Sequence, residues 1–312
     1  MKVFQGFETI EHIPNPVLTI GTFDGVHVGH QKIIDRLNFE AEKIGGESVL
    51  FTFYPHPRMV LYPENHGMEL IQTQAEKIDK LRRCGLKNVI VHPFTREFSR
   101  LTALEFVRDY LVNKLHVKKL VIGYDHQFGK NREGSIEFLR DVCETYGFEV
   151  IEISAQEVND VNVSSTKVRN AIQNGDPEKA NHFLGEPFEL NGKVVGGKEL
   201  GRQIGFPTAN IDIESDIKLL PKTGVYAVNV VFNDGGTCKG MMNIGVKPTI
   251  GGDESVSIEV HLFDFNRDIY GLYVTVQLLS RFRDEQRFDS VDDLKEQLDK
   301  DESSIRTYFT IK

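Results

Sequence analysis

A change of hydrophobic pattern near residue 184 constrains the fold of this chain more than any other feature. Before it, short apolar runs alternate with stretches whose apolar residues recur every three or four positions. After it, apolar runs follow one another with no helical pattern between them until about residue 290. The first pattern favours a parallel sheet covered by helices, and the second favours antiparallel strands. With 312 residues, we expect two domains, at 1–184 and 185–312.

The first part is predicted to be a Rossmann-like α/β unit with a parallel sheet. Thr73 with Glu76, and Thr102 with Glu105, have the spacing of capping boxes, which mark the starts of helices. Ser135 is a further N-cap candidate. The expected strands are the apolar runs 17–20, 48–53, 88–92, 120–124 and 148–153.

The second part is predicted to be a small antiparallel β-barrel with a terminal helix after Ser290. Asp234-Gly235 between two apolar runs is a hairpin signal. The expected strands are 225–232, a run ending at 243, 255–262 and 269–279. A loop-rich stretch is expected where glycines crowd together, at Gly192, Gly196, Gly197, Gly201 and Gly205.

The segment from residue 21 to residue 30 joins the first expected strand to the first helical pattern. Gly21, Gly25 and Gly29 allow the backbone to approach a ligand closely. The N-terminus of the helix offers free N–H groups and the positive end of a dipole. His27 and His30 are three residues apart there, so both rings can face one side. We therefore expect a phosphate site, although the segment is neither a Walker loop nor a Gly-x-Gly-x-x-Gly turn.

A second candidate anion site precedes a short helical pattern. Ser164, Ser165 and Thr166 bring hydroxyls and free N–H groups, and Arg169 follows one turn later. Taken alone, this segment is better explained as an ordinary N-cap with a solvated arginine.

Two loops at the ends of expected strands are weaker candidates. The loop from Gly123 to Gly129 contains Asp125 and Phe128, and its alternative explanation is a plain glycine-bounded loop. His56 lies between two prolines at another strand end, where parallel sheets place ligands. A lone histidine there is more often structural.

The second part carries oxygen ligands and one carboxylate of interest. Thr208 and Asn210 offer a hydroxyl and an amide oxygen, which are ligands that Mg²⁺ accepts. Strand alternation puts Glu259 on the face opposite its apolar neighbours. That face of a barrel can be solvent, so a surface glutamate is the alternative.

The first part resembles the nucleotidylyltransferases, and most of all the bacterial bifunctional riboflavin kinase/FAD synthetases. Seven positions of the 21–30 segment resemble the long form of their His-x-Gly-His signature, and residues 164–169 resemble their Ser-Ser-Thr-x-x-Arg motif. The 123–129 loop is similar to their flavin- and nucleotide-contacting loop, with His126 where many members have Phe. The resemblance implies catalytic roles for His27, His30, Ser165 and Arg169. It implies nucleotide or flavin contacts from Gly21, Phe23, Asp24, Gly25, Gly29, Gly123, Asp125, Phe128, Ser164 and Thr166.

The second part resembles the riboflavin kinases. Residues 205–210 look like their Pro-Thr-Ala-Asn motif, and the segments starting at Asn243 and Ile258 are also similar to these enzymes. The resemblance implies that Thr208 and Asn210 hold Mg²⁺ and the ATP phosphates, with Glu259 as general base. It implies further substrate contacts from Gly205, Phe206, Pro207 and Asn243.

Together, the two resemblances imply FAD biosynthesis: ATP phosphorylates riboflavin to FMN in the second domain, and a second ATP adenylylates FMN in the first. Two alternatives stay open. One is a nucleotidylyltransferase that acts on pantetheine phosphate or nicotinamide mononucleotide, which would not need a kinase-like second part. The other is a flavin-binding module without turnover.

Composition bounds the partners and the compartment. A net charge of −9 argues against a nucleic-acid-binding surface, and therefore against an aminoacyl-tRNA synthetase. A site for ATP in such a chain requires local positive charge or Mg²⁺. Cys84, Cys143 and Cys238 are far apart in the sequence, as expected of reduced thiols in the cytoplasm. With no signal peptide and no long apolar run, we expect small-molecule partners only and no membrane. Oligomer formation is left open.

Overall fold

The computed structural model describes residues 1–65, 67–123, 126–154, 163–197, 200–248 and 254–311. Two compact units make up the chain, Met1–Ser165 and Thr166–Lys312. This division lies before the expected boundary at 184, which stays a prediction.

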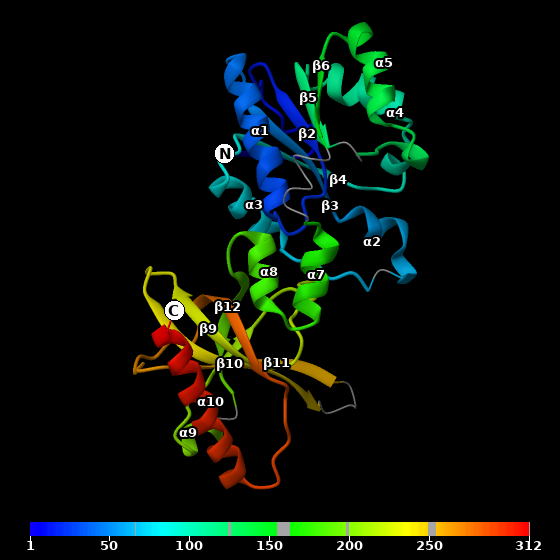
Figure 1. Cartoon of the computed structure of the whole chain (residues 1–312). Coiled ribbons are helices and arrows are strands. Elements are labelled where there is room, and N and C mark those ends of the chain that lie inside the picture. The colour runs from blue at the N-terminus through cyan, green and yellow to red at the C-terminus, as the bar shows by residue number, and fades with distance from the viewer. Residues whose placement is uncertain (66, 124–125, 155–162, 198–199, 249–253, 312) are drawn as a thin grey trace. The chain divides into compact units, whose positions relative to one another are not determined.

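The first unit is built on a six-stranded sheet in the order β1-β4-β3-β2-β5-β6 (Figure 1). All neighbouring pairs are parallel. The five expected strands are confirmed. A sixth, β1, was not predicted; it is a four-residue strand at the edge of the sheet, beside β4. The strands are β1 (Lys2–Gln5), β2 (Val17–Ile20), β3 (Ser48–Tyr54), β4 (Asn88–Pro93), β5 (Lys119–Gly123) and β6 (Glu149–Ile153).

Helices cover both faces of this sheet, because alternate residues of its strands are buried on opposite sides. One core joins residues such as Val17 and Leu50 to α1 and α3, and the other joins Leu18 and Phe51 to η3 and α5. Both predicted capping boxes form, at Thr73 and Thr102. The helical segments are α1 (Val28–Lys43), α2 (Pro57–Leu61), η1 (Pro63–Asn65), α3 (Gln74–Arg83), η2 (Phe98–Arg100), α4 (Ala103–Glu105), the π-helical η3 (Phe106–Val112), η4 (Lys130–Arg132) and α5 (Ile136–Tyr146).

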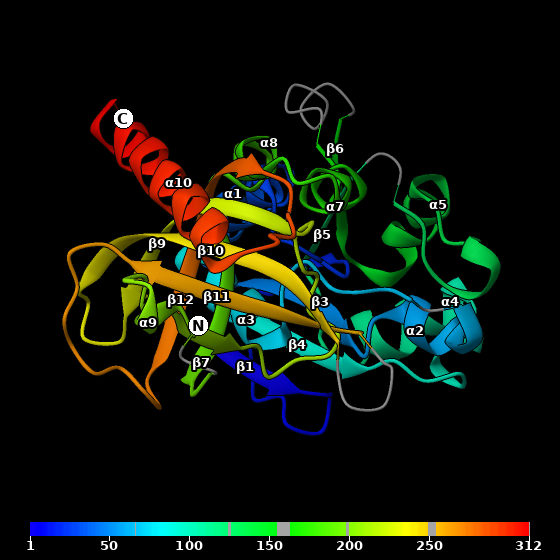
Figure 2. The same cartoon turned by 90° about the horizontal axis from the view of Figure 1, so that it is seen from below.

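The second unit is a closed barrel of six antiparallel strands in the order β10-β11-β8-β7-β12-β9 (Figure 2). The predicted hairpin at Asp234-Gly235 joins β9 to β10. Helix α10 packs on the outer face of the barrel, where Ile305 meets Phe206 and Met241. The elements are α7 (Ser165–Gln173), whose first residue is the last of the first unit, α8 (Pro177–Leu184), β7 (Phe188–Val195), α9 (Leu200–Gln203), β8 (Ala209–Asp212), β9 (Gly224–Phe232), β10 (Thr237–Pro248), β11 (Glu254–Leu262), β12 (Tyr273–Arg283) and α10 (Val291–Ile311).

The loop predicted from the crowded glycines is wrong in its first part. Gly192 lies within β7, whose residues alternate between buried and half-buried. A Cβ on Gly192 would lie 2.5 Å from the carbonyl oxygen of Asp212, so this glycine allows close strand packing. Helix α9 and strand β8 follow it.

Across the part of the chain that the structure describes, no helix is both long enough and apolar enough to span a bilayer.

Candidate active sites

The first candidate site lies where β2 ends and α1 begins. His27 is the N-cap of α1, and its Nδ1 accepts a hydrogen bond from the backbone N–H of His30 at 3.3 Å. An Nδ1 that accepts must be unprotonated, which leaves the proton of the neutral ring on Nε2. Burial lowers the pKa of His27 to about 4. Burial, with the nearby His27 and Lys77, holds the pKa of His30 well below its usual value. Near neutral pH the two rings therefore offer polar nitrogens rather than positive charge.

The two imidazoles form a stack with Phe23. The His27 and His30 ring centroids are 3.7 Å apart at 12°, and the Phe23 and His30 centroids are 4.3 Å apart at 20°. Among the described residues, the buried Nδ1 of His30 has no hydrogen-bond partner. Such an atom is costly to leave unsatisfied, so a ligand that supplies a partner gains affinity here.

The glycine-rich turn packs closely against the side chain of Ile71. Gly25 has φ +75°, and a Cβ there would lie 2.7 Å from the side chain of Ile71. The buried Asp24 accepts the backbone N–H of Ile71 at 3.0 Å, so this carboxylate holds the turn in place. Ser165 Oγ donates to the Asp24 carbonyl at 2.8 Å. The structure thus brings two of the predicted motifs together, although they are 141 residues apart.

Lys77 of α3 contacts the start of this turn and was not among the predicted site residues. Its Nζ donates to the Thr22 carbonyl at 3.2 Å and to Thr52 Oγ1 at 3.3 Å. The signal was available in the sequence, because Lys77 is four residues before Leu81 and therefore shares the buried face of α3.

The remaining predicted residues of the first half are placed as follows. Gly123 ends β5, and the backbone of Phe128 pairs with that of Gly134 through hydrogen bonds of 3.1 and 2.9 Å. Asp125 lies outside the described residues. Ser164 directly precedes α7, whereas Thr166 and Arg169 belong to the second unit, so their part in the first site stays a prediction.

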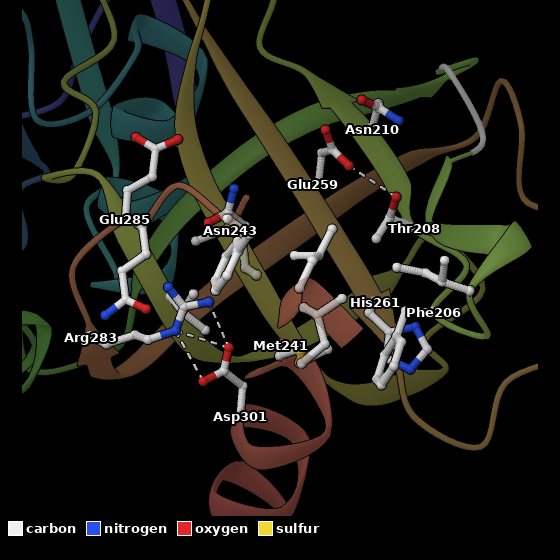
Figure 3. Close-up of a pocket in the computed structure, with 18 residues that line it drawn as sticks. Phe206, Thr208, Asn210, Met241, Asn243, Glu259, His261, Arg283, Glu285 and Asp301 are labelled. Carbon is white, nitrogen blue, oxygen red and sulfur yellow. Dashed lines mark hydrogen bonds and ion pairs between the residues drawn. The ribbon is translucent and has the colours of Figure 1, made fainter. Parts of the chain in front are cut away.

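The second candidate site is a row of polar residues across three neighbouring strands of the barrel. Glu259 of β11 pairs in register with Asn243 of β10 on one side and with Asn210 of β8 on the other. Thr208 Oγ1 donates to Glu259 Oε2 at 3.0 Å, as Figure 3 shows. Residues from three separate predicted segments therefore meet on one barrel face.

This row borders a cavity of about 300 Å³. Its walls are mainly apolar, with a few convergent polar groups, which is typical of sites for small organic ligands. The barrel face and α10 both contribute to the lining, which includes Phe206, Val225, Met241, Phe288, Leu294 and Leu298. A second hollow, of about 520 Å³, is lined by Val194, Arg202, Pro207, Thr208, Arg267 and Tyr270. Thr208 lines both.

Two contacts position the parts of this cavity. The buried His261 donates from Nδ1 to the Pro207 carbonyl at 2.8 Å and thereby fixes the segment that carries Phe206 and Thr208. Arg283 of β12 binds Asp301 of α10 through both carboxylate oxygens, with distances of 2.7 to 3.0 Å. This ion pair was not predicted, because Arg283 and Asp301 lie on different elements and no short motif joins them.

The donors near Thr208 fit Mg²⁺ better than a transition metal. Among the described residues, no group of three or more His, Cys, Asp or Glu side chains could hold a metal ion. Thr208 donates a hydrogen bond to Glu259, which leaves the lone pairs of its hydroxyl oxygen available to a cation. A hydroxyl, an amide oxygen and a carboxylate suit a hard cation that keeps waters and takes phosphate oxygens.

Comparison with known proteins identifies both units. Residues 9–167 match the family model described as FAD synthetase, and residues 184–309 match the one described as riboflavin kinase. The chain is 38% identical to a bifunctional riboflavin kinase/FMN adenylyltransferase of Escherichia coli, over 99% of this chain and 98% of the relative. It is 40% identical to one from Listeria monocytogenes, over 95% and 93% of the two chains.

A solved structure shares the fold along almost the whole chain. It is described as a macrolide-efflux protein from Streptococcus pneumoniae and matches with a TM-score of 0.88 at 35% identity, covering 97% of this chain and 98% of that one. From the two matched family models and the relatives of similar length, the chain belongs to the bifunctional riboflavin kinase/FMN adenylyltransferase family, with the kinase in its second unit and the FAD synthetase in its first.

Proposed function

We propose that the row of Asn243, Glu259 and Asn210 is the site of riboflavin phosphorylation. The hydrogen bond between Thr208 and Glu259 supports this assignment most directly, because it joins the Pro-Thr-Ala-Asn segment to the carboxylate. Glu259 accepts the proton of the riboflavin 5′-hydroxyl as that oxygen attacks the γ-phosphorus of ATP. FMN and ADP are the products.

The two hollows suit the two substrates. We assign the largely apolar cavity beside α10 to the flavin ring, with Phe206 and Asn243 among its contacts. The hollow lined by Arg202 and Arg267 is assigned to ATP. Thr208 lines both, so the reacting groups meet beside it. Gly205 and Pro207 shape the segment that leads to Thr208.

Thr208 and Asn210 are proposed to hold Mg²⁺. When bound, the ion neutralises charge on the ATP phosphates.

In the first unit, we propose that FMN is adenylylated at the start of α1. The FMN phosphate attacks the α-phosphorus of ATP, the bond to the β-phosphate breaks, and pyrophosphate leaves. A phosphate nucleophile is already ionised near neutral pH, so the protein needs to position groups rather than remove a proton. His27, His30 and the N–H groups of α1 bind the phosphates, with Ser165 beside Asp24 of the turn. The motif that Ser165 shares with Thr166 and Arg169 supports a role for these two residues in the same reaction. Gly21, Phe23, Asp24, Gly25 and Gly29 shape the turn, and Gly123, Asp125, Phe128 and Ser164 contact flavin or nucleotide.

The three cysteines form no disulfide, which suits a reducing compartment, and we propose the cytoplasm. The proposed partners are ATP and flavins.

A chromatographic time course with riboflavin, ATP and Mg²⁺ tests both assignments. FMN that appears and then converts to FAD supports them. FMN alone contradicts the adenylylation site under those conditions. If neither product forms, FMN is supplied directly, and FAD formed from it supports the first unit only. No product from either substrate contradicts both.

A further inference from the structure

The proposed adenylylation site must hold the phosphates of two anionic substrates in a chain of net charge −9. Its two histidines contribute no positive charge near neutral pH, because burial keeps both rings neutral. The dipole of α1 contributes only a partial charge. A formal charge close to the site would therefore matter, and among the described residues Lys77 offers one.

Burying an ammonium is unfavourable unless the structure compensates it, and the side chain of Lys77 lies in the core with an exposed fraction of only 6%. Thr22 and Thr52 accept two of its three N–H bonds. Thr52 also donates its hydroxyl proton to the same Thr22 carbonyl, at 3.2 Å. The lysine thus ties the first residues of the glycine-rich turn to α3 and β3.

The charges around Lys77 connect it to the proposed phosphate site. The carboxylate of Asp24 favours the charged lysine, whereas burial lowers the Lys77 pKa to about 8. In turn, the ammonium lowers the pKa of His30, so the two groups are within electrostatic reach. Asp24 of the turn and His30 of α1 are the titratable groups whose charge states are coupled to that of Lys77.

We propose that Lys77 is a positioning residue for adenylyl transfer, which fixes the Thr22 carbonyl and supplies positive charge near neutral pH beside the neutral histidines. This inference rests on the proposed function of the first unit. It assigns a role to a residue outside the three segments, 21–30, 123–129 and 164–169, that carry the family resemblance.

Three variants distinguish the effect of the positive charge of Lys77 from the effect of its hydrogen bonds to Thr22 and Thr52. Lys77→Met removes the charge from a side chain of similar length. Thr52→Val removes one acceptor and keeps the ammonium. Arg82→Met is the matched control, because it removes one positive charge from the exposed side of α3, where Arg82 pairs with Asp79. Each preparation is assayed for FAD formation from FMN and ATP, for riboflavin phosphorylation and for thermal unfolding.

We expect Lys77→Met to lower kcat/KM for FAD formation by about tenfold or more, since a fixed charge aimed at developing charge stabilises a transition state. Thr52→Val is expected to stay within about threefold and Arg82→Met within about twofold of wild type, with riboflavin phosphorylation unchanged in all three. Wild-type kcat/KM in Lys77→Met would overturn the inference. An equal loss of kcat/KM in Thr52→Val would mean that the hydrogen bonds of Lys77 matter and its charge does not. That result would also overturn the inference.

The pH profile of the wild-type enzyme tests the charge without any variant, in case Lys77→Met does not fold. FAD formation should decline as pH rises through about 8, where Lys77 loses its proton. A flat profile from pH 7 to about 9.5 would overturn the inference. If the wild-type enzyme forms no FAD from FMN, the proposed function of this unit fails as well, which distinguishes the two failures.

Discussion

The two proposed sites both bind ATP, but they carry opposite charge: a buried cation in the first and a carboxylate in the second. In the first unit, neutral His27 and His30 stack at the N-terminus of α1, and the buried cation of Lys77 binds the Thr22 carbonyl of the same turn. In the second, the carboxylate of Glu259 lies between two amide side chains and accepts a hydrogen bond from Thr208.

The difference follows from the two nucleophiles. FMN brings a phosphate that is already ionised, so its site needs hydrogen-bond donors and positive charge. Riboflavin brings an alcohol, which must lose a proton as it attacks, so its site needs a carboxylate within reach. Because each unit is matched to one nucleophile, changes in one unit should leave the other reaction intact.

The largest effect is expected from Glu259→Gln. The amide keeps the shape and loses the base, so riboflavin phosphorylation should fall by about 10²- to 10⁴-fold. FAD formation from supplied FMN should stay within about twofold of wild type, because it uses the other unit. Product chromatography with each substrate separately checks both rates. Loss of both activities would mean that the sites are not separate.

The second largest effect is expected from His30→Ala, which should impair FAD formation and spare FMN formation. His30→Ala removes the central ring of the stack, and FAD formation should fall by about 10²- to 10³-fold, as for loss of a transition-state hydrogen bond. FMN formation should be unchanged. Single-turnover measurements with FMN and ATP give the rate of the first reaction. A variant that forms FAD at the wild-type rate would remove His30 from the proposed site.

The third effect is a loss of folding stability, which we expect from a substitution at Arg283 in the second unit. Arg283→Met leaves the buried Asp301 carboxylate without its bidentate partner, which should cost about 3 kcal/mol of unfolding free energy. Because the pair ties α10 to the barrel, the KM for riboflavin should also rise. Lys300→Met is a control, since Lys300 pairs with Glu296 on the exposed face of α10. Denaturant titration and kinase kinetics measure both effects, and equal stability of the two variants would refute the expectation.

The smallest effect concerns acid stability of the first unit. The His27 pKa is lowered to about 4 in the folded chain, so the unfolded chain binds the proton more readily between pH 6.5 and 4. Stability is therefore lost as pH falls through this range. Between pH 7 and 5, His27 accounts for about 2 kcal/mol of that loss. His27→Gln should flatten this part of the pH dependence, as thermal unfolding at the two pH values can show. An unchanged slope would count against a buried neutral His27.

Hydrophobic periodicity and short motifs predicted most of the architecture. The five longer apolar runs became strands of the parallel sheet, and the capping boxes at Thr73 and Thr102 formed. The edge strand β1 was missed because four residues carry little periodic signal. Strand β7 was missed because Gly192 was taken as a loop residue, whereas it lies where a neighbouring strand passes too close for a Cβ.

The sequence by itself determined the identity of the chemical groups in the two sites: histidines and hydroxyls at helix starts in the first unit, and Thr208, Asn210 and Glu259 in the second. These are local patterns, set by spacing along the chain. Only the tertiary structure decided their protonation states and partners. Burial made His27 and His30 neutral, strand register placed Glu259 beside Asn243 and Asn210, and packing of α3 brought Lys77 into contact with the turn. Desolvation and long-range contacts depend on which distant segments meet, and no local pattern encodes that.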